Sequence, residues 1–142
     1  MLKYISKLFI FILFVSCHSK GKTPYKIEEL SKEVKRVGMV IKLKEETLEE
    51  YKRVHADDHE GVRDLLSKYG LRNFNIFLIK LDDGHYYEFG YYEYHGSDYE
   101  TDMAKLAAEP RNIKWGELCS PMQIPLEGYE DWAMMEPIYF NP

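Results

Sequence analysis

The sequence contains little cysteine and no excess of basic residues, and both shortages exclude functions. Cys17 and Cys119 are the two cysteines among 142 residues, so the chain has no cysteine-based metal motif. Lysine and arginine number 19 against 24 aspartates and glutamates, which gives a formal net charge of −5. A chain without a basic patch lacks the surface that tracks phosphates, so we do not expect nucleic acid as a partner.

Long apolar runs are also missing, because the longest one extends only from Leu8 to Val15. That run is too short to cross a bilayer as a helix. It follows two lysines, Lys3 and Lys7, and ends just before a Ser-Cys pair, an arrangement typical of a signal peptide. We therefore expect residues 1–17 to be a leader, whose removal takes the formal charge from −5 to −7.

The end of this leader resembles a bacterial lipobox, in which the cysteine becomes the lipidated N-terminus. The string is Phe14-Val15-Ser16-Cys17, with Phe where Leu is usual. The alternative is a plain secretory signal with an incidental cysteine. Because Cys17 stands where the apolar run ends, we expect a lipid-anchored protein of the cell envelope, on the periplasmic side or in the outer membrane. Residues 18–35 would be its tether, and Cys119 a free structural thiol.

The apolar pattern after the tether predicts one domain over residues 36–142. Alternating apolar residues predict a strand from Arg36 to Lys44 with one buried face. After this strand, apolar residues recur at helical spacing from Leu48 to Tyr69, which predicts a helical segment with a break among the Asp and Gly residues at 57–61. Gly70 ends this segment.

Two aromatic-rich strands are predicted next, from Leu71 to Leu81 and from His85 to Tyr94, joined by a hairpin at Asp82-Asp83-Gly84. Alternation divides the tyrosines of the second strand between the two faces of the sheet. Tyr86, Tyr92 and Tyr94 share one face, and Tyr87 and Tyr91 the other. The twelve tyrosines of the chain fit either a tyrosine-rich sheet or a carbohydrate site, where flat rings stack on the C–H faces of sugars.

The last third of the chain predicts two helices and a strand. Ser97 with Glu100 forms a capping box that starts a helix ending at Glu109. A short helix from Asn112 to Leu118 follows, and Trp132 to Phe140 is a last strand, at an edge or with a bulge because of its proline.

The element order is therefore β-α-β-β-α-β, the ferredoxin-like arrangement of the α+β class. Two helices cover one face of such a four-stranded sheet and leave the other face open. That face is apolar here, so a second copy of the chain is its simplest cover. The pattern predicts a homodimer of the dimeric α/β-barrel type.

Tyr51 and His55 are candidate chemical groups, because residues four apart project from one face of a helix. An imidazole and a phenol beside a cavity can carry out acid–base work near neutral pH. The alternative is a partly buried histidine with a satisfied hydrogen bond. His55 and His59 also have a spacing that suits a metal, with Asp58 or Glu60 as an oxygen ligand. No third histidine has a fixed spacing, so we expect no metal.

Several segments, in order, resemble the L-rhamnose mutarotase family over about residues 37–140. They are Glu49-Glu50-Tyr51-Lys52-Arg53-Val54-His55, Arg72-Asn73-Phe74-Asn75-Ile76-Phe77, residues 86–94, Asp102-Met103-Ala104-Lys105-Leu106-Ala107-Ala108 and Met135-Glu136-Pro137-Ile138-Tyr139-Phe140. The resemblance implies dimeric ferredoxin-like isomerases that interconvert the α and β anomers of L-rhamnose without metal or cofactor. It also implies that His55 is the proton donor and that Tyr51 and Trp115 contact the sugar.

The sequence departs from this family at the expected pocket. Gly116 replaces the second of two adjacent tryptophans, and Phe74 replaces a sugar-contacting tyrosine. His59 stands where the family has a further tryptophan. Either His59 and Glu60 supply new polar contacts to the sugar, or catalysis has weakened or been lost. Two hypotheses follow. The first is an envelope mutarotase that acts on L-rhamnose or a related deoxy sugar, and the second is a non-catalytic sugar-binding or structural lipoprotein on the same fold.

Overall fold

The computed structural model describes residues 34–141. The predicted leader, Cys17 with its predicted lipidation, and nearly all of the predicted tether lie outside these residues. Within them the elements follow the order β-α-β-β-α-β, with short additions, so the predicted ferredoxin-like arrangement is confirmed. The longest described helices have ten residues each, and none of the described helices has the length and apolar character needed to span a membrane.

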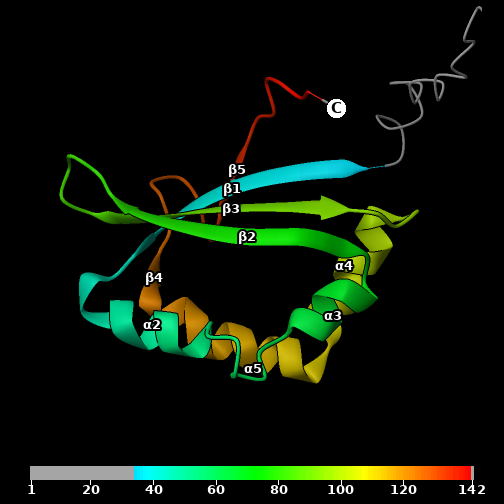
Figure 1. The fold of residues 1–142 in the computed structure, drawn as a ribbon, viewed down its shortest axis with the longest axis horizontal. Coiled ribbons are helices and arrows are strands. Elements are labelled where there is room, and N and C mark those ends of the chain that lie inside the picture. Colours follow the sequence, from blue (N-terminus) through cyan, green and yellow to red (C-terminus); the bar gives the residue numbers. More distant parts are fainter. Residues whose placement is uncertain (1–33, 142) are drawn as a thin grey trace, which may run out of the picture.

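One antiparallel sheet forms the upper layer of the molecule (Figure 1). The central strand β1 (Lys35–Leu43) pairs with β3 (Tyr86–Tyr94), and β3 pairs with β2 (Leu71–Lys80) at one edge. On its other side β1 pairs with the short strands β4 (Gln123–Ile124) and β5 (Ala133–Met135). The first strand and the last strands therefore lie side by side although they are far apart in the sequence.

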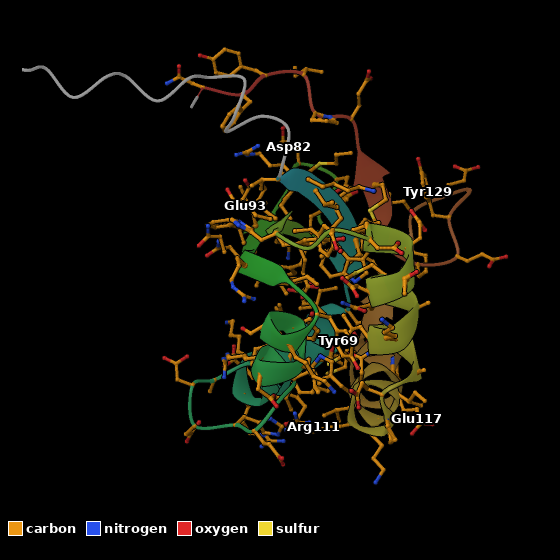
Figure 2. All side chains as sticks on the ribbon, turned by 90° about the vertical axis from the view of Figure 1, so that its right-hand side faces the viewer. Tyr69, Asp82, Glu93, Arg111, Glu117 and Tyr129 are labelled. Atoms are coloured by element: carbon orange, nitrogen blue, oxygen red, sulfur yellow. The ribbon has the colours of Figure 1, made fainter. Side chains whose placement is uncertain are left out.

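Four helices lie together on one side of this sheet (Figure 1). They are α2 (Leu48–Val54), α3 (Arg63–Lys68), α4 (Tyr99–Ala108) and α5 (Pro110–Cys119), with short 3-10 turns at Glu45–Thr47 and Ser120–Met122. The predicted break at 57–61 is confirmed, because α2 and α3 are separate helices. Figure 2 shows Asp82 and Glu93 at the sheet side and Arg111 and Glu117 at the helix side, with Tyr69 between them.

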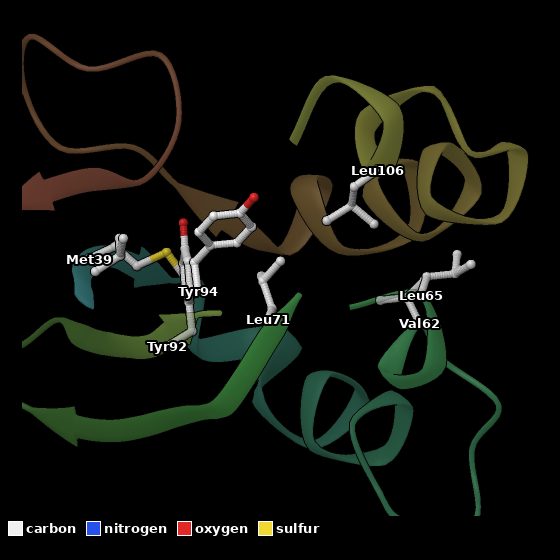
Figure 3. Packing of buried hydrophobic residues seen from close by; sticks show 8 residues of the cluster. Met39, Val62, Leu65, Leu71, Tyr92, Tyr94 and Leu106 are labelled. Atoms are coloured by element: carbon white, nitrogen blue, oxygen red, sulfur yellow. The ribbon is translucent and has the colours of Figure 1, made fainter. Parts of the chain in front are cut away.

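The core lies between the sheet and the helices. The apolar residues of β1 are buried as predicted, at positions 37, 39, 41 and 43. Tyr92 and Tyr94 of β3 are buried on the same side, in one core cluster with Leu65 of α3 and Leu106 of α4 (Figure 3). The alternation of residues along β3 did not show which of its two faces the helices cover. In the structure they cover the face that carries Tyr92 and Tyr94.

The start of α4 and of α5 differs from the prediction. The N-cap of α4 is Asp98, whose side chain accepts a hydrogen bond from the Thr101 amide at 3.1 Å, so the Ser97–Glu100 capping box was wrong. Helix α5 begins at Pro110 and not at Asn112, because proline lacks an amide hydrogen that the first helical turn would leave unpaired in any case.

The last strand is much shorter than predicted. Pairing with β1 ends where Met135 lies opposite Gly38, two residues before Pro137, which has no amide hydrogen to donate. The chain beyond it is extended and exposed, with Ile138 91% and Tyr139 82% accessible. Strand β4 could not be predicted, since a strand of two residues carries no periodicity.

Candidate functional site

A cavity of about 700 Å³ opens between the sheet and helices α2, α3 and α5. Its wall contains five of the six residues expected at the site, which are Tyr51, His55, Phe74, Trp115 and Gly116. Three separate elements, α2, β2 and α5, contribute them, so the fold brings together residues up to 65 positions apart. Helix α2 supplies the pair that was expected to carry out proton transfer.

Tyr51 and His55 form a stacked pair at the C-terminal end of α2. Their ring centroids lie 4.1 Å apart with an angle of 26° between the planes. His55 is the C-cap of the helix, and its amide donates to the Tyr51 carbonyl at 3.2 Å. Because α2 stops there, the imidazole caps the helix end and faces the cavity together with the phenol.

Hydrogen bonding fixes the tautomer of His55. Its Nδ1 lies 2.8 Å from the Tyr51 carbonyl oxygen. A carbonyl oxygen can only accept, so Nδ1 carries the proton and Nε2 of the neutral ring is the acceptor. Burial lowers the pKa of His55; the hydrogen bond to Tyr51 opposes this shift, and the positive charge of Arg63 adds to it. The imidazole is therefore neutral at pH 7, with Nε2 ready to take a proton and return it.

Arg63 holds the loop between α2 and α3 in place. Its guanidinium donates to the carbonyls of His55 at 2.6 Å, Ala56 at 3.2 Å and His59 at 3.4 Å. An ion pair with Asp57 at 3.4 Å adds to these contacts. The loop that the sequence predicted only as a break is thus tied to the first residue of α3.

Trp115 of α5 contacts two histidines. Its ring meets His55 edge-on at 5.0 Å between centroids and an angle of 69°. The His59 ring lies 5.7 Å away. Beside it, a side chain added at Gly116 would meet nothing within 4 Å, so this position faces open space. Trp115 therefore forms part of the cavity wall and also packs on the core.

His59 is not in the cavity wall. Its Nδ1 accepts a hydrogen bond from the Gly61 amide at 3.2 Å, and its ring lies against Trp115. Phe74, in contrast, lines the cavity and stacks flat on Tyr92 at 5.5 Å. Among residues 34–141, no group of three histidine, cysteine or acidic side chains is placed to hold a metal ion.

Two polar residues were missed by sequence reasoning, Gln123 in the cavity wall and Glu88 behind it. Gln123 of β4 places its amide nitrogen 3.1 Å from the Tyr51 hydroxyl and 3.1 Å from the Glu88 carboxyl. Glu88 is 1% exposed, and burial raises its pKa to about 7. The sequence did contain a signal for Glu88. In a strand, residues an even number of positions apart share a face, so Glu88 lies on the helix-facing side of β3 with Tyr86, Tyr92 and Tyr94.

Cys119 lies in the same region, at the end of α5. It is a buried free thiol, as expected for a structural cysteine. Burial raises its pKa to about 12, so the thiol stays protonated at neutral pH.

Comparison with known proteins gives a family and a similar structure. The family model described as L-rhamnose mutarotase matches residues 36–140. The crystal structure of an L-rhamnose mutarotase from Formosa agariphila is similar at a TM-score of 0.56 and 18% sequence identity, covering 76% of this chain and 99% of that chain. This likeness supports the fold.

A second solved structure, described as an antibiotic biosynthesis monooxygenase from Nitrosomonas europaea, has a TM-score of 0.46 and 17% identity. The match covers 74% of this chain and 100% of that chain. Comparison with curated protein sequences gives no match.

Proposed function

Because the chain belongs to the L-rhamnose mutarotase family, we propose that it interconverts the α and β anomers of L-rhamnose or a related deoxy sugar. The observation that carries this proposal is the stacked pair of Tyr51 and His55 in the wall of a cavity of about 700 Å³. Its volume lies within the range of small-molecule sites, about 300–1,000 Å³.

The proposed reaction moves one proton. When the ring opens, the bond between C1 and the ring oxygen breaks, the anomeric hydroxyl loses its proton and the ring oxygen gains one. His55 Nε2 takes the first proton and donates it to the ring oxygen, while Nδ1 remains bonded to the Tyr51 carbonyl. The open aldehyde rotates about the C1–C2 bond, and the reverse transfer closes the ring as the other anomer.

Tyr51 has a different part in this scheme. Burial, followed by the nearby carboxyl of Glu88, raises the pKa of the phenol far above its usual range. A hydroxyl that stays protonated cannot act as a base at neutral pH. Tyr51 therefore holds a sugar oxygen by hydrogen bonding, and the transferred proton stays with His55.

The apolar wall of the cavity supports a deoxy sugar as substrate. Trp115 and Phe74 offer ring surface to the C–H faces and the methyl group of such a sugar. The open space beside Gly116 and the missing hydroxyl at Phe74 leave fewer contacts than the family pattern has. We therefore expect weaker and less selective sugar binding.

The second candidate function is sugar binding without catalysis, which these two departures favour. Saturation-transfer NMR on the protein with a panel of L- and D-sugars separates the two functions, since it reports binding and anomer exchange together. Exchange between the anomeric proton signals above the buffer rate supports the mutarotase. Binding without exchange for every sugar in the panel would establish the binding protein instead.

We also propose a homodimer through the open face of the sheet. All described helices lie on the opposite face (Figure 1). The open face carries Phe77 opposite Phe89 and Ile79 opposite Tyr87. Phe77 is 63% and Ile79 51% exposed. A contiguous apolar patch of this kind favours a partner surface, and a two-fold axis would let the same patch cover itself.

The proposed location is the cell envelope, with the lipidated Cys17 as anchor. The leader pattern of residues 1–17 supports it. In that place the enzyme would act on free sugars outside the inner membrane.

A further inference from the structure

Glu88 is a buried acid in an apolar position of the sheet. It stands in the middle of β3, opposite Ile41 on β1 and Leu78 on β2, and is 1% exposed. One carboxyl oxygen, Oε2, accepts a hydrogen bond from Gln123 Nε2 at 3.1 Å. The other, Oε1, has no hydrogen-bond partner among residues 34–141. Burying a carboxyl in such surroundings is costly, so a role beyond packing is to be sought.

Gln123 connects this carboxyl to the cavity. Its Nε2 lies 3.1 Å from the Tyr51 hydroxyl as well as 3.1 Å from Glu88. An amide nitrogen only donates, so the oxygen of Tyr51 is an acceptor in this contact. The phenol must then direct its own O–H elsewhere. Two directions are open. One is outward into the cavity that Tyr51 lines. The other is inward toward the Glu88 carboxyl, which shares the Gln123 amide with the phenol, has an unpartnered Oε1 and lies near enough to raise the pKa of Tyr51.

The charge of Glu88 decides between these directions. An ionised carboxyl only accepts, so it draws the Tyr51 O–H inward. A protonated carboxyl donates to the phenol oxygen, and the phenol O–H is then released to the cavity. The described titratable groups that face Glu88 are Tyr51 of α2 and Cys119 of α5. Burial raises the pKa of both, so both stay neutral at pH 7, whereas the pKa of Glu88 is raised to about 7.

We propose that Glu88 is a positioning residue for Tyr51, which in its protonated form turns the phenol O–H toward a bound sugar. This inference rests on the proposed sugar site and adds a pH dependence to it. The cavity offers a hydrogen-bond donor at Tyr51 when Glu88 holds its proton, and only an acceptor when Glu88 is ionised. Sugar binding is therefore stronger on the acid side of neutrality, apart from any effect of His55.

The test uses the full-length protein with ¹³C at the Glu carboxyl and Tyr Cζ carbons, titrated from pH 5.5 to 8.5. Spectra of Glu88→Gln and Tyr51→Phe assign the two signals. We expect the Glu88 and Tyr51 signals to change with one shared midpoint, and the Tyr51 step to disappear in Glu88→Gln. A Tyr51 signal that is flat across this range in the wild type, or that keeps its step in Glu88→Gln, would overturn the inference.

The second readout is the dissociation constant of L-rhamnose over the same range. From pH 6 to 8 we expect it to rise roughly 2–10-fold in the wild type, which is what one neutral hydrogen bond is worth. Glu88→Gln keeps a neutral side chain of the same shape at every pH. From pH 6 to 8, the dissociation constant of L-rhamnose for Glu88→Gln should therefore change by less than about twofold beyond the change seen for Tyr51→Phe. An equal pH dependence in wild type and Glu88→Gln would contradict the inference. If L-rhamnose binds at no pH, the proposed substrate fails, and the shared NMR midpoint alone decides the role of Glu88.

Discussion

The His55 imidazole stacks on the Tyr51 ring at 4.1 Å and donates its Nδ1 proton to the Tyr51 carbonyl at 2.8 Å. One residue thus fixes both the plane and the tautomer of the other. The consequence is that His55 exchanges protons only through Nε2, toward the cavity. This pairing connects a four-residue spacing in the sequence to the proposed chemistry.

The buried carboxyl of Glu88 should make the protein more stable in mild acid. Folding raises the pKa of Glu88 from 4.5 to about 7. The stabilisation is complete below pH 4.5 and is lost as the pH rises through 7, because the folded state must then give up a proton that it holds more tightly than the unfolded chain does. The shift corresponds to up to about 3 kcal/mol.

The measurement is urea unfolding of wild type and Glu88→Gln at pH 4.5 and pH 8. Relative to the variant, the wild type should lose up to about 3 kcal/mol over this range. Glu93→Gln on the same strand is the control, because hydrogen bonding, first of all from His95, lowers the pKa of Glu93. The stability that this carboxyl contributes is lost below pH 4.5, so little change is expected between pH 4.5 and pH 8. A wild type and a Glu88→Gln variant that change in parallel with pH would refute a raised pKa at Glu88.

Removing the Trp115 ring should weaken sugar binding. We expect Trp115→Ala to raise the dissociation constant roughly 2–10-fold, since an aromatic contact is worth about 0.5–1.5 kcal/mol beyond its buried area. Calorimetric titration measures the change, with circular dichroism as the check of folding. Tyr129→Ala is the matched control, because Tyr129 is 52% exposed and outside the cavity wall. Equal losses in the two variants would rule out a sugar contact at Trp115.

A charge on the open sheet face should break the proposed dimer. Light scattering on the protein lacking residues 1–20 should give twice the monomer mass, and Ile79→Lys should give the monomer. Ile113→Lys is the matched control, because Ile113 on α5 is 49% exposed, close to the 51% of Ile79, and lies on the helix side. A wild type that is monomeric at micromolar concentration would end this proposal.

Lipidation should depend on Cys17. Metabolic labelling with a palmitate analogue should label the wild type, and Cys17→Ser should remain unlabelled, because the thiol is the attachment point in a lipobox. Cys119→Ser controls for labelling at the other cysteine, which is buried and stays protonated. Equal labelling of wild type and Cys17→Ser would show that the leader is a plain secretory signal.

Periodicity predicted those parts of the fold in which neighbours along the chain share a face. The buried face of β1 and the pairing of Tyr51 with His55 follow from periods of 2 and 3.6 residues. The split of the β3 tyrosines was also correct. The cap of α4 was wrong because Ser97 and Asp98 are both good caps and only the backbone path selects Asp98.

The rest of the site depends on contacts between distant segments. The contact of Glu88 with Gln123 joins residues 35 apart, and it follows from the pairing of β1 with both β3 and β4. The position of His59 depends on the loop after α2, where Gly61 has a φ of +51°. No helical or strand period describes that loop, so the sequence could not show that Trp115 would contact both His59 and His55.

The central claim is that His55 carries the proton of anomer exchange, and one pair of variants tests it most directly. The exchange rate of the anomeric proton signals of L-rhamnose is measured above the buffer rate for wild type, His55→Ala and His59→Ala. General acid–base catalysis is worth about 10²–10⁴-fold, so His55→Ala should slow exchange by roughly that factor. His59→Ala should stay near wild type, because His59 lies outside the cavity wall. Exchange that survives His55→Ala but is lost in His59→Ala would contradict the account.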